Sequence, residues 1–207
     1  MSPRGRAIPD VREQLFDAAD RILERDGPDG LTSRAITDEA GCAKGMLHNH
    51  FTDLDRFLTE YALDRISRTT EHASELRSQA GQATVTGNLT QAALTVFGPP
   101  VLRVSALLMS RPALMAEVSQ AIAKGGPPFA ELERAVTAYL DAEKDLGRIA
   151  PSADTQMIAF TLLGSVHHLF FTRGLAPLDE AHVRQIVDAL VNGLAMPGAA
   201  RPGTEPR

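Results

Sequence analysis

The sequence contains one cysteine and no tryptophan in 207 residues. The single thiol, Cys42, excludes an intramolecular disulfide framework and any zinc site built from several thiolates. No apolar run reaches the roughly 18 residues that would cross a bilayer, and the first residues lack the apolar stretch of a secretory signal. We therefore expect a cytoplasmic protein with no membrane partner.

Patterns that mark an active site are also missing. The chain has no serine-centred nucleophile elbow, no glycine-rich phosphate loop and no metal-ligand spacing. His48 and His50 lie two residues apart on an expected helix, so they do not share a face that could hold a metal. These absences predict a protein that is not an enzyme, with no catalytic residues, no cofactor and no bound metal.

The charge balance excludes one further class. The formal net charge is −5, and even the first 80 residues contain more Asp and Glu than Lys and Arg. Such a chain does not coat nucleic acid through bulk electrostatics. Any DNA binding must therefore depend on a small surface with suitable local geometry.

The apolar residues follow a helical period almost everywhere, and no segment shows the sustained alternation of a strand. This pattern predicts an all-α fold of about nine helices. The tail 197–207 has no periodicity, which predicts disorder. The expected helical ranges are 11–26, 33–40, 44–51, 53–80, 90–97, 101–110, 113–124, 129–146, 154–172 and 179–195.

The segment 32–51 has the pattern of a helix-turn-helix. Thr32 is the expected N-cap of a short helix, and Gly41 ends that helix where the chain must adopt positive φ. A second short helix follows, with Leu47 and Phe51 as its inward pair. Two short helices joined by a glycine-containing turn are typical of proteins that place the second helix in a major groove.

A set of short motifs surrounds and includes this segment: Leu15-Phe16-Asp17-Ala18-Ala19, Ile22-Leu23, Gly30-Leu31-Thr32, Ile36, Ala40-Gly41, Gly45-Met46-Leu47, His50-Phe51 and Phe57-Leu58. Through these motifs the chain resembles the tetracycline-repressor (TetR) family of transcriptional regulators over about residues 10–66. The resemblance implies an arm and a three-helix DNA-binding domain at 1–52, connected by helix 53–80 to a larger ligand-binding and dimerisation domain at 81–196.

The resemblance implies a double-stranded palindromic operator as partner. Three positions depart from the family pattern: Ala43 replaces a Ser or Thr N-cap, His48 replaces Tyr, and Leu54 replaces Lys. We expect these departures to alter DNA affinity or operator preference. The expected DNA-binding residues are Arg6, Thr32, Ser33, Arg34, Lys44, Gly45, Met46, His48, Asn49 and His50.

The region after residue 80 is expected to bind a small effector and a second copy of the chain. The effector is expected to be mostly apolar or aromatic, since few charged residues are among the candidates. The expected pocket residues are Phe97, Arg103, Met109, Met115, Phe129, Tyr139, Phe160 and His167. The expected homodimer residues, on helices 154–172 and 179–195, are Leu163, Phe170, Val183, Ile186, Val187, Leu190, Val191 and Leu194.

These expectations combine into one function and one alternative. The first is a repressor released from its operator by the effector, which binds better to a dimer with wrongly spaced recognition helices. The alternative is a helix-turn-helix protein regulated by protein contact, or by oxidation of Cys42.

Overall fold

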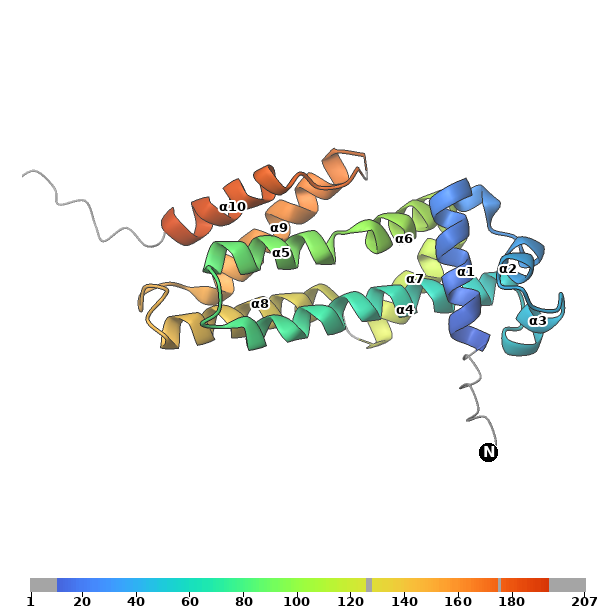
Figure 1. The fold of residues 1–207 in the computed structure, drawn as a ribbon, viewed down its shortest axis with the longest axis horizontal. Helices are drawn as coiled ribbons and strands as arrows, with labels where there is room; N and C mark the ends of the chain where they lie inside the picture. The colour runs from blue at the N-terminus through green and yellow to red at the C-terminus, as the bar shows by residue number, and fades with distance from the viewer. Residues whose placement is uncertain (1–10, 126–127, 175, 194–207) are drawn as a thin grey trace, which may run out of the picture. The chain divides into compact units, whose positions relative to one another are not determined.

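The computed structural model describes residues 11–125, 128–174 and 176–193. These residues form α-helices and two short 3-10 helices, with no strand among them, which confirms the all-α prediction (Figure 1). The elements are α1 (Val11–Asp26), η1 (Pro28–Gly30), α2 (Ser33–Glu39), α3 (Met46–His50), α4 (Leu54–Ser74), η2 (Glu75–Gln79), α5 (Val85–Val96), α6 (Pro99–Ser110), α7 (Pro112–Gly125), α8 (Pro128–Asp145), α9 (Thr155–Thr172) and α10 (Glu180–Gly193). The expected tail 197–207 lies outside the described residues.

Local side-chain caps explain where several helices begin. Thr32 Oγ1 accepts a 3.1 Å hydrogen bond from the Ala35 amide at the start of α2. Asp53 Oδ1 accepts a 2.8 Å bond from the Arg56 amide at the start of α4. Each bond satisfies a backbone donor that the first turn of a helix would leave unpaired. The expected cap Thr32 is therefore confirmed.

Three prolines begin helices rather than separating them. Pro99, Pro112 and Pro128 are the first residues of α6, α7 and α8. Proline suits this position because the first amide of a helix has no intrahelical acceptor and φ near −65° is already helical. These helices therefore begin one or two residues earlier than expected.

The helix expected at 90–97 begins earlier still, at Val85. Thr84 Oγ1 accepts a 3.0 Å hydrogen bond from the Gly87 amide and caps its first turn. The amide of Asn88 is buried and bonds to the backbone of Gln82 and to the hydroxyl of Tyr139. Gly87 and Asn88 therefore belong to the helix, although their residue types favour a loop.

The described residues form two compact units, each with its own core. The first contains residues 11–71, 97–125, 128, 174 and 176–177, and within it α6 packs against α1, η1 and α7. The second contains residues 72–96, 129–173 and 178–193. The expected functional division near residue 80 remains a prediction.

The core of the first unit is built on α1 and α4. Phe16, Phe51, Phe57 and Tyr61 are each at most 3% exposed, and their ring centroids lie 5.0 to 6.3 Å apart. Aromatic rings at this spacing bury a large apolar area and fix the helices that carry them. This aromatic core holds α1, α4 and the end of α3 together.

One stretch, Val85–Ser110, passes a length and composition test for a membrane span. The structure divides it at Gly98 into α5 and α6, each of 12 residues. Leu89, Val104 and Leu107 from these helices are at most 2% exposed. The stretch is a pair of core helices.

Candidate nucleic-acid interface

The turn between α2 and α3 has a fixed geometry. Gly41 has a φ of 65°, which a side chain would disfavour. The Cys42 amide then donates a 3.0 Å hydrogen bond to the Thr37 carbonyl. Ile36 on α2 and Leu47 on α3 are fully buried on the inner side of this corner. The two helices therefore pack through their apolar sides, as the helix-turn-helix pattern predicts.

The observed α3 is shorter than the expected helix 44–51. The Met46 amide donates a 2.8 Å bond to the Ala43 carbonyl in a turn, and the N-cap position falls on Gly45. Gly45 makes no side-chain cap bond. The assignment of Ala43 as N-cap was therefore wrong by two residues, because the turn after Gly41 uses that residue.

The outer side of α3 is exposed, apart from one residue. Leu47 is buried and Phe51 is 3% exposed, so they anchor the helix. Met46 is half-buried and lies at the margin of the exposed surface. The exposed residues of the turn and helix are Lys44, Gly45, His48, Asn49 and His50.

The start of α2 adds a second exposed surface beside α3. Thr32 and Arg34 are exposed and Ser33 is half-buried. Arg34 lies 3.4 Å from Asp38, and both side chains are more than half exposed. An exposed pair of this kind contributes at most about 1 kcal/mol, so the guanidinium can exchange this partner for a phosphate. Arg6 lies outside the described residues.

Ion pairs and a hydrogen bond connect α1 to the C-terminal end of α2. Arg21 Nε lies 2.7 Å from Glu39 Oε1, and Arg25 Nη1 lies 2.9 Å from Glu39 Oε2. Hydrogen bonds from the two guanidinium groups lower the pKa of the Glu39 carboxyl. Gln14 of α1 donates a 2.6 Å bond to the Ala40 carbonyl at the end of α2. In Figure 1, α2 and α3 lie to one side of α1, and α6 and α7 lie to the other side.

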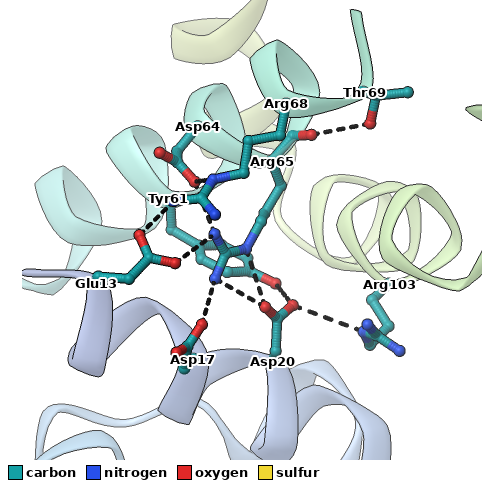
Figure 2. Close-up of polar contacts among 9 residues, drawn as sticks. All are labelled: Glu13, Asp17, Asp20, Tyr61, Asp64, Arg65, Arg68, Thr69 and Arg103. Carbon is teal, nitrogen blue, oxygen red and sulfur yellow. Dashed lines mark hydrogen bonds and ion pairs between the residues drawn. The ribbon is translucent and has the colours of Figure 1, made fainter. Parts of the chain in front are cut away.

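A buried arginine on α4 connects that helix to α1 (Figure 2). Arg65 is 6% exposed, and its guanidinium reaches carboxylates on both helices. Its partners are Asp64 at 2.7 Å, Asp20 at 2.8 Å, Asp17 at 3.2 Å and Glu13 at 3.4 Å. A buried guanidinium needs such partners because an unpaired buried charge is strongly destabilising.

The carboxylate of Asp20 also contacts two further groups. Tyr61 donates its hydroxyl to Asp20 at 2.6 Å, and Arg103 Nε of α6 lies 3.7 Å from the same carboxylate. Burial, followed by the charge of Asp20, raises the pKa of the Tyr61 hydroxyl. We call Asp20, Tyr61, Arg65 and Arg103 the Asp20 network. Sequence reasoning did not find it, because its members lie far apart along the chain.

The expected pocket residues divide between the two units, and the pocket itself remains a prediction. Phe97, Arg103, Met109 and Met115 belong to the first unit, and the other four residues belong to the second. Arg103 is part of the Asp20 network and Phe97 is 3% exposed. Met109 is 59% exposed, and Met115 is 38% exposed.

Three of the other pocket candidates meet at a surface hollow of about 290 Å³ on α8 and α9. The His167 ring lies 4.9 Å from Phe129 in an edge-on arrangement, and burial lowers the pKa of this imidazole. Tyr139 is fully buried and bonds to Asn88 instead. The residues that line the hollow are Phe129, Glu133, Phe160, Leu163, Gly164 and His167.

The expected dimer residues divide into two groups. Leu163, Phe170, Val183 and Val187 are at most 8% exposed, so these side chains are already covered by their own chain. Helix α10 packs against α5 and α9 within the second unit. The half-buried members are Ile186, Leu190 and Val191, and Leu194 lies outside the described residues.

Comparison with known proteins finds a family match for one segment of the chain. Residues 15–60 match the family model of the bacterial regulatory proteins of the tetR family. This segment is therefore similar to that family. The matched residues include α2, the turn and α3, where the exposed surface described above lies.

One curated relative is similar over a short stretch of the chain. A 56-residue stretch is 34% identical to an uncharacterised HTH-type transcriptional regulator of Haemophilus influenzae; it covers 27% of this chain and 30% of that protein. The chain thus matches under a third of that relative's length.

Solved structures extend the likeness of the fold to nearly the whole chain. A protein from Mesorhizobium loti assigned to the TetR family is 20% identical, with 92% of this chain and 97% of that chain covered and a TM-score of 0.68. The multidrug binding protein EbrR, complexed with ethidium, is 23% identical, with 89% and 99% covered and a TM-score of 0.55.

Proposed function

We propose that this protein is a sequence-specific, DNA-binding transcriptional regulator of the TetR family that acts in the cytoplasm. The proposal rests on one observation: α3 is anchored through a buried apolar side and exposes its polar side. Leu47 and Phe51 fix its inner side, while Lys44, His48 and Asn49 remain exposed. Polar side chains on a short, anchored helix can contact base edges in a major groove.

The DNA surface contains few permanent charges. Lys44 is the exposed cation of the turn before α3, and Arg34 is the exposed cation of α2. Thr32, Ser33, His48 and His50 supply further hydrogen-bonding groups for phosphates. Each phosphate neutralised by a cation makes the slope of log K against log salt concentration steeper by about 0.9. We therefore expect a shallow salt dependence, with hydrogen bonds supplying much of the specificity.

The homodimer is proposed to form through an exposed apolar stripe on α9. Met157, Phe160 and Phe171 are between 47% and 62% exposed, and Gly164 and His168 are exposed between them. Their spacing of three or four residues is that of a helix-packing seam. A Cβ at Gly164 would meet nothing within 4 Å, so a partner helix can approach closely there.

The α8–α9 hollow continues this stripe and would be covered by the second subunit. Phe129, on the rim of the hollow, is 45% exposed. Large apolar side chains gathered on one face are typical of a subunit interface. A two-fold dimer also carries two copies of α3, as binding to successive major grooves, roughly 34–36 Å apart, requires.

Regulation is proposed to be repression relieved by a small apolar or aromatic effector. EbrR, which has the same fold, is described as a multidrug binding protein and is complexed with ethidium. The oxidation alternative has less support, because Cys42 is half-buried and burial raises the pKa of its thiol. A raised pKa lowers the thiolate fraction that reacts with oxidants.

Binding of the full-length protein to a duplex from its own upstream region tests this function. Fluorescence anisotropy at 50 to 200 mM salt should show tight binding to a palindromic duplex and much weaker binding to a scrambled duplex. Ethidium is the first effector probe, and its release of the protein from the duplex should be measured. Because ethidium also intercalates into DNA, its binding to the protein without DNA should be titrated as the control. Equal affinity for palindromic and scrambled duplexes would contradict the proposal.

A further inference from the structure

We propose that Asn49 reads an A·T base pair in each half-site and so determines the base preference of the protein. This inference rests on the proposed function, in which α3 occupies the major groove. It assigns the recognition of A·T to one side chain among the exposed residues of the turn and α3.

The position of Asn49 on α3 supports the assignment. Successive residues of an α-helix are rotated by about 100°, so Asn49 lies about 200° around the axis from Leu47. Leu47 is fully buried and marks the inner side. Asn49 therefore lies almost opposite the core, whereas His48 and His50 lie on the two flanks. A side chain opposite the core is the one that meets the floor of a groove.

The hydrogen-bonding state of Asn49 supports it as well. His48 Nδ1 lies 3.4 Å from the Thr52 carbonyl and so has a backbone neighbour. Within the described ranges, the Asn49 amide makes no side-chain hydrogen bond, and the residue is exposed. Its oxygen and nitrogen are both available to a ligand, and their geometry matches the N6 amino group and N7 of adenine.

Gly45 leaves space beside this amide. It lies four residues before Asn49, on the same side of the helix. Its φ is −80°, and a Cβ there would meet nothing within 4 Å. The fold therefore does not require glycine at this position. Because Gly45 has no side chain, nothing at this position covers the Asn49 amide on the outer surface of α3.

The neighbouring side chains Lys44 and Met46 do not have the donor and acceptor pair that adenine requires. Lys44 precedes the helix and carries a positive charge, which suits a phosphate or the O6 and N7 acceptors of guanine. Met46 is half-buried and has no strong donor or acceptor. Asn49 is thus the residue of the helix whose donor and acceptor pair selects adenine.

Selection from a pool of randomised palindromic duplexes tests the inference with the full-length protein. Wild type should select A·T at one position of each half-site. Asn49→Ala should lose that preference by about tenfold or more and keep the preferences at the other positions. Asn49→Gln should retain a preference for adenine, and His50→Ala should lower affinity while keeping the adenine preference.

Two contrary results have different meanings. If Asn49→Ala selects the same sequence as wild type, with equal preference at every position, the assignment of Asn49 is wrong and the proposed function stands. If wild type selects no sequence while circular dichroism shows a folded helical protein, the proposed function fails, and the inference fails with it.

Discussion

The hydroxyl of Tyr61 on α4 donates a 2.6 Å hydrogen bond to the carboxylate of Asp20 on α1. Arg65 and Arg103 contact the same carboxylate, at 2.8 and 3.7 Å, so one side chain contacts groups on α4 and α6. α1 in turn supports α2 through Arg21 and Glu39. The Asp20 network therefore helps to fix the angle at which the helix-turn-helix is held.

Tyr61→Phe removes the hydroxyl that bonds to Asp20 and should lower the free energy of unfolding by about 1.5–3 kcal/mol, the usual range for a hydrogen bond to a charged group. Urea denaturation followed by circular dichroism measures the change. The ring of Tyr61 is fully buried, and phenylalanine keeps its packing. An unchanged unfolding midpoint would show that the bond contributes nothing.

The same variant should change the response to alkaline pH. The pKa of Tyr61 is raised by burial and by Asp20, so near pH 10 the unfolded chain loses this proton before the folded chain does. The folded state then binds more protons, and stability falls as pH rises above about 10. Tyr61→Phe should show a shallower fall between pH 9 and 11. An equally steep fall in both proteins would contradict this reading.

Arg65→Met should destabilise the first unit by about 3–5 kcal/mol, because it leaves Glu13, Asp17, Asp20 and Asp64 close together without their shared cation. Arg34→Met is the matched control, since its ion pair is exposed, and it should change stability by less than about 1 kcal/mol. Chemical denaturation of the two variants makes the comparison. Similar decreases in the free energy of unfolding of both variants would show that Arg65 contributes no more to stability than an exposed arginine.

Gly45→Ala should separate stability from DNA binding. An alanine Cβ meets no neighbour and φ is ordinary, so the variant should be as stable as wild type, or more stable by about 0.4–1 kcal/mol. Operator affinity should fall, because the methyl group lies beside Asn49 on the surface proposed to face the groove. Thermal unfolding and anisotropy titration provide the two measurements. A stable variant with full affinity would remove Gly45 from the interface.

Phe160→Asp should convert the proposed dimer to a monomer, since a charge would enter the apolar stripe of α9. The residue is 62% exposed in the chain, so folding should be preserved. Leu146→Asp is the control: Leu146 is 56% exposed in the same unit but is not part of the stripe. Light scattering should give half the mass for Phe160→Asp alone. Equal masses for both variants would move the interface elsewhere.

The parts of the fold that depend on local chemistry could be predicted from the sequence. Thr32 and Asp53 cap their helices through residues three positions away, and Leu47 and Phe51 are inward because of their spacing. These features need only a short window of sequence. The helix-turn-helix was therefore predicted correctly, apart from the helix ends: α2 ends at Glu39 and α3 spans only Met46–His50.

The parts that depend on distant partners could not be predicted. The apolar face of α10, with Val183 and Val187, indicated a surface that must be covered, but periodicity does not distinguish a neighbouring helix from a second subunit. Arg65 contacts residues up to 52 positions away, a distance that charge spacing along one helix does not reveal. The candidate pocket residues likewise belong to two units.

The central claim is that two copies of α3 contact one duplex, and hydroxyl-radical footprinting of the full-length protein on its selected palindrome tests it most directly. We predict two protected segments one helical turn apart, about 10–10.5 base pairs centre to centre or a multiple of this spacing, and loss of both in Phe160→Asp. Protection that is uniform along the duplex, or that is unchanged by Lys44→Ala and Asn49→Ala together, would contradict the account.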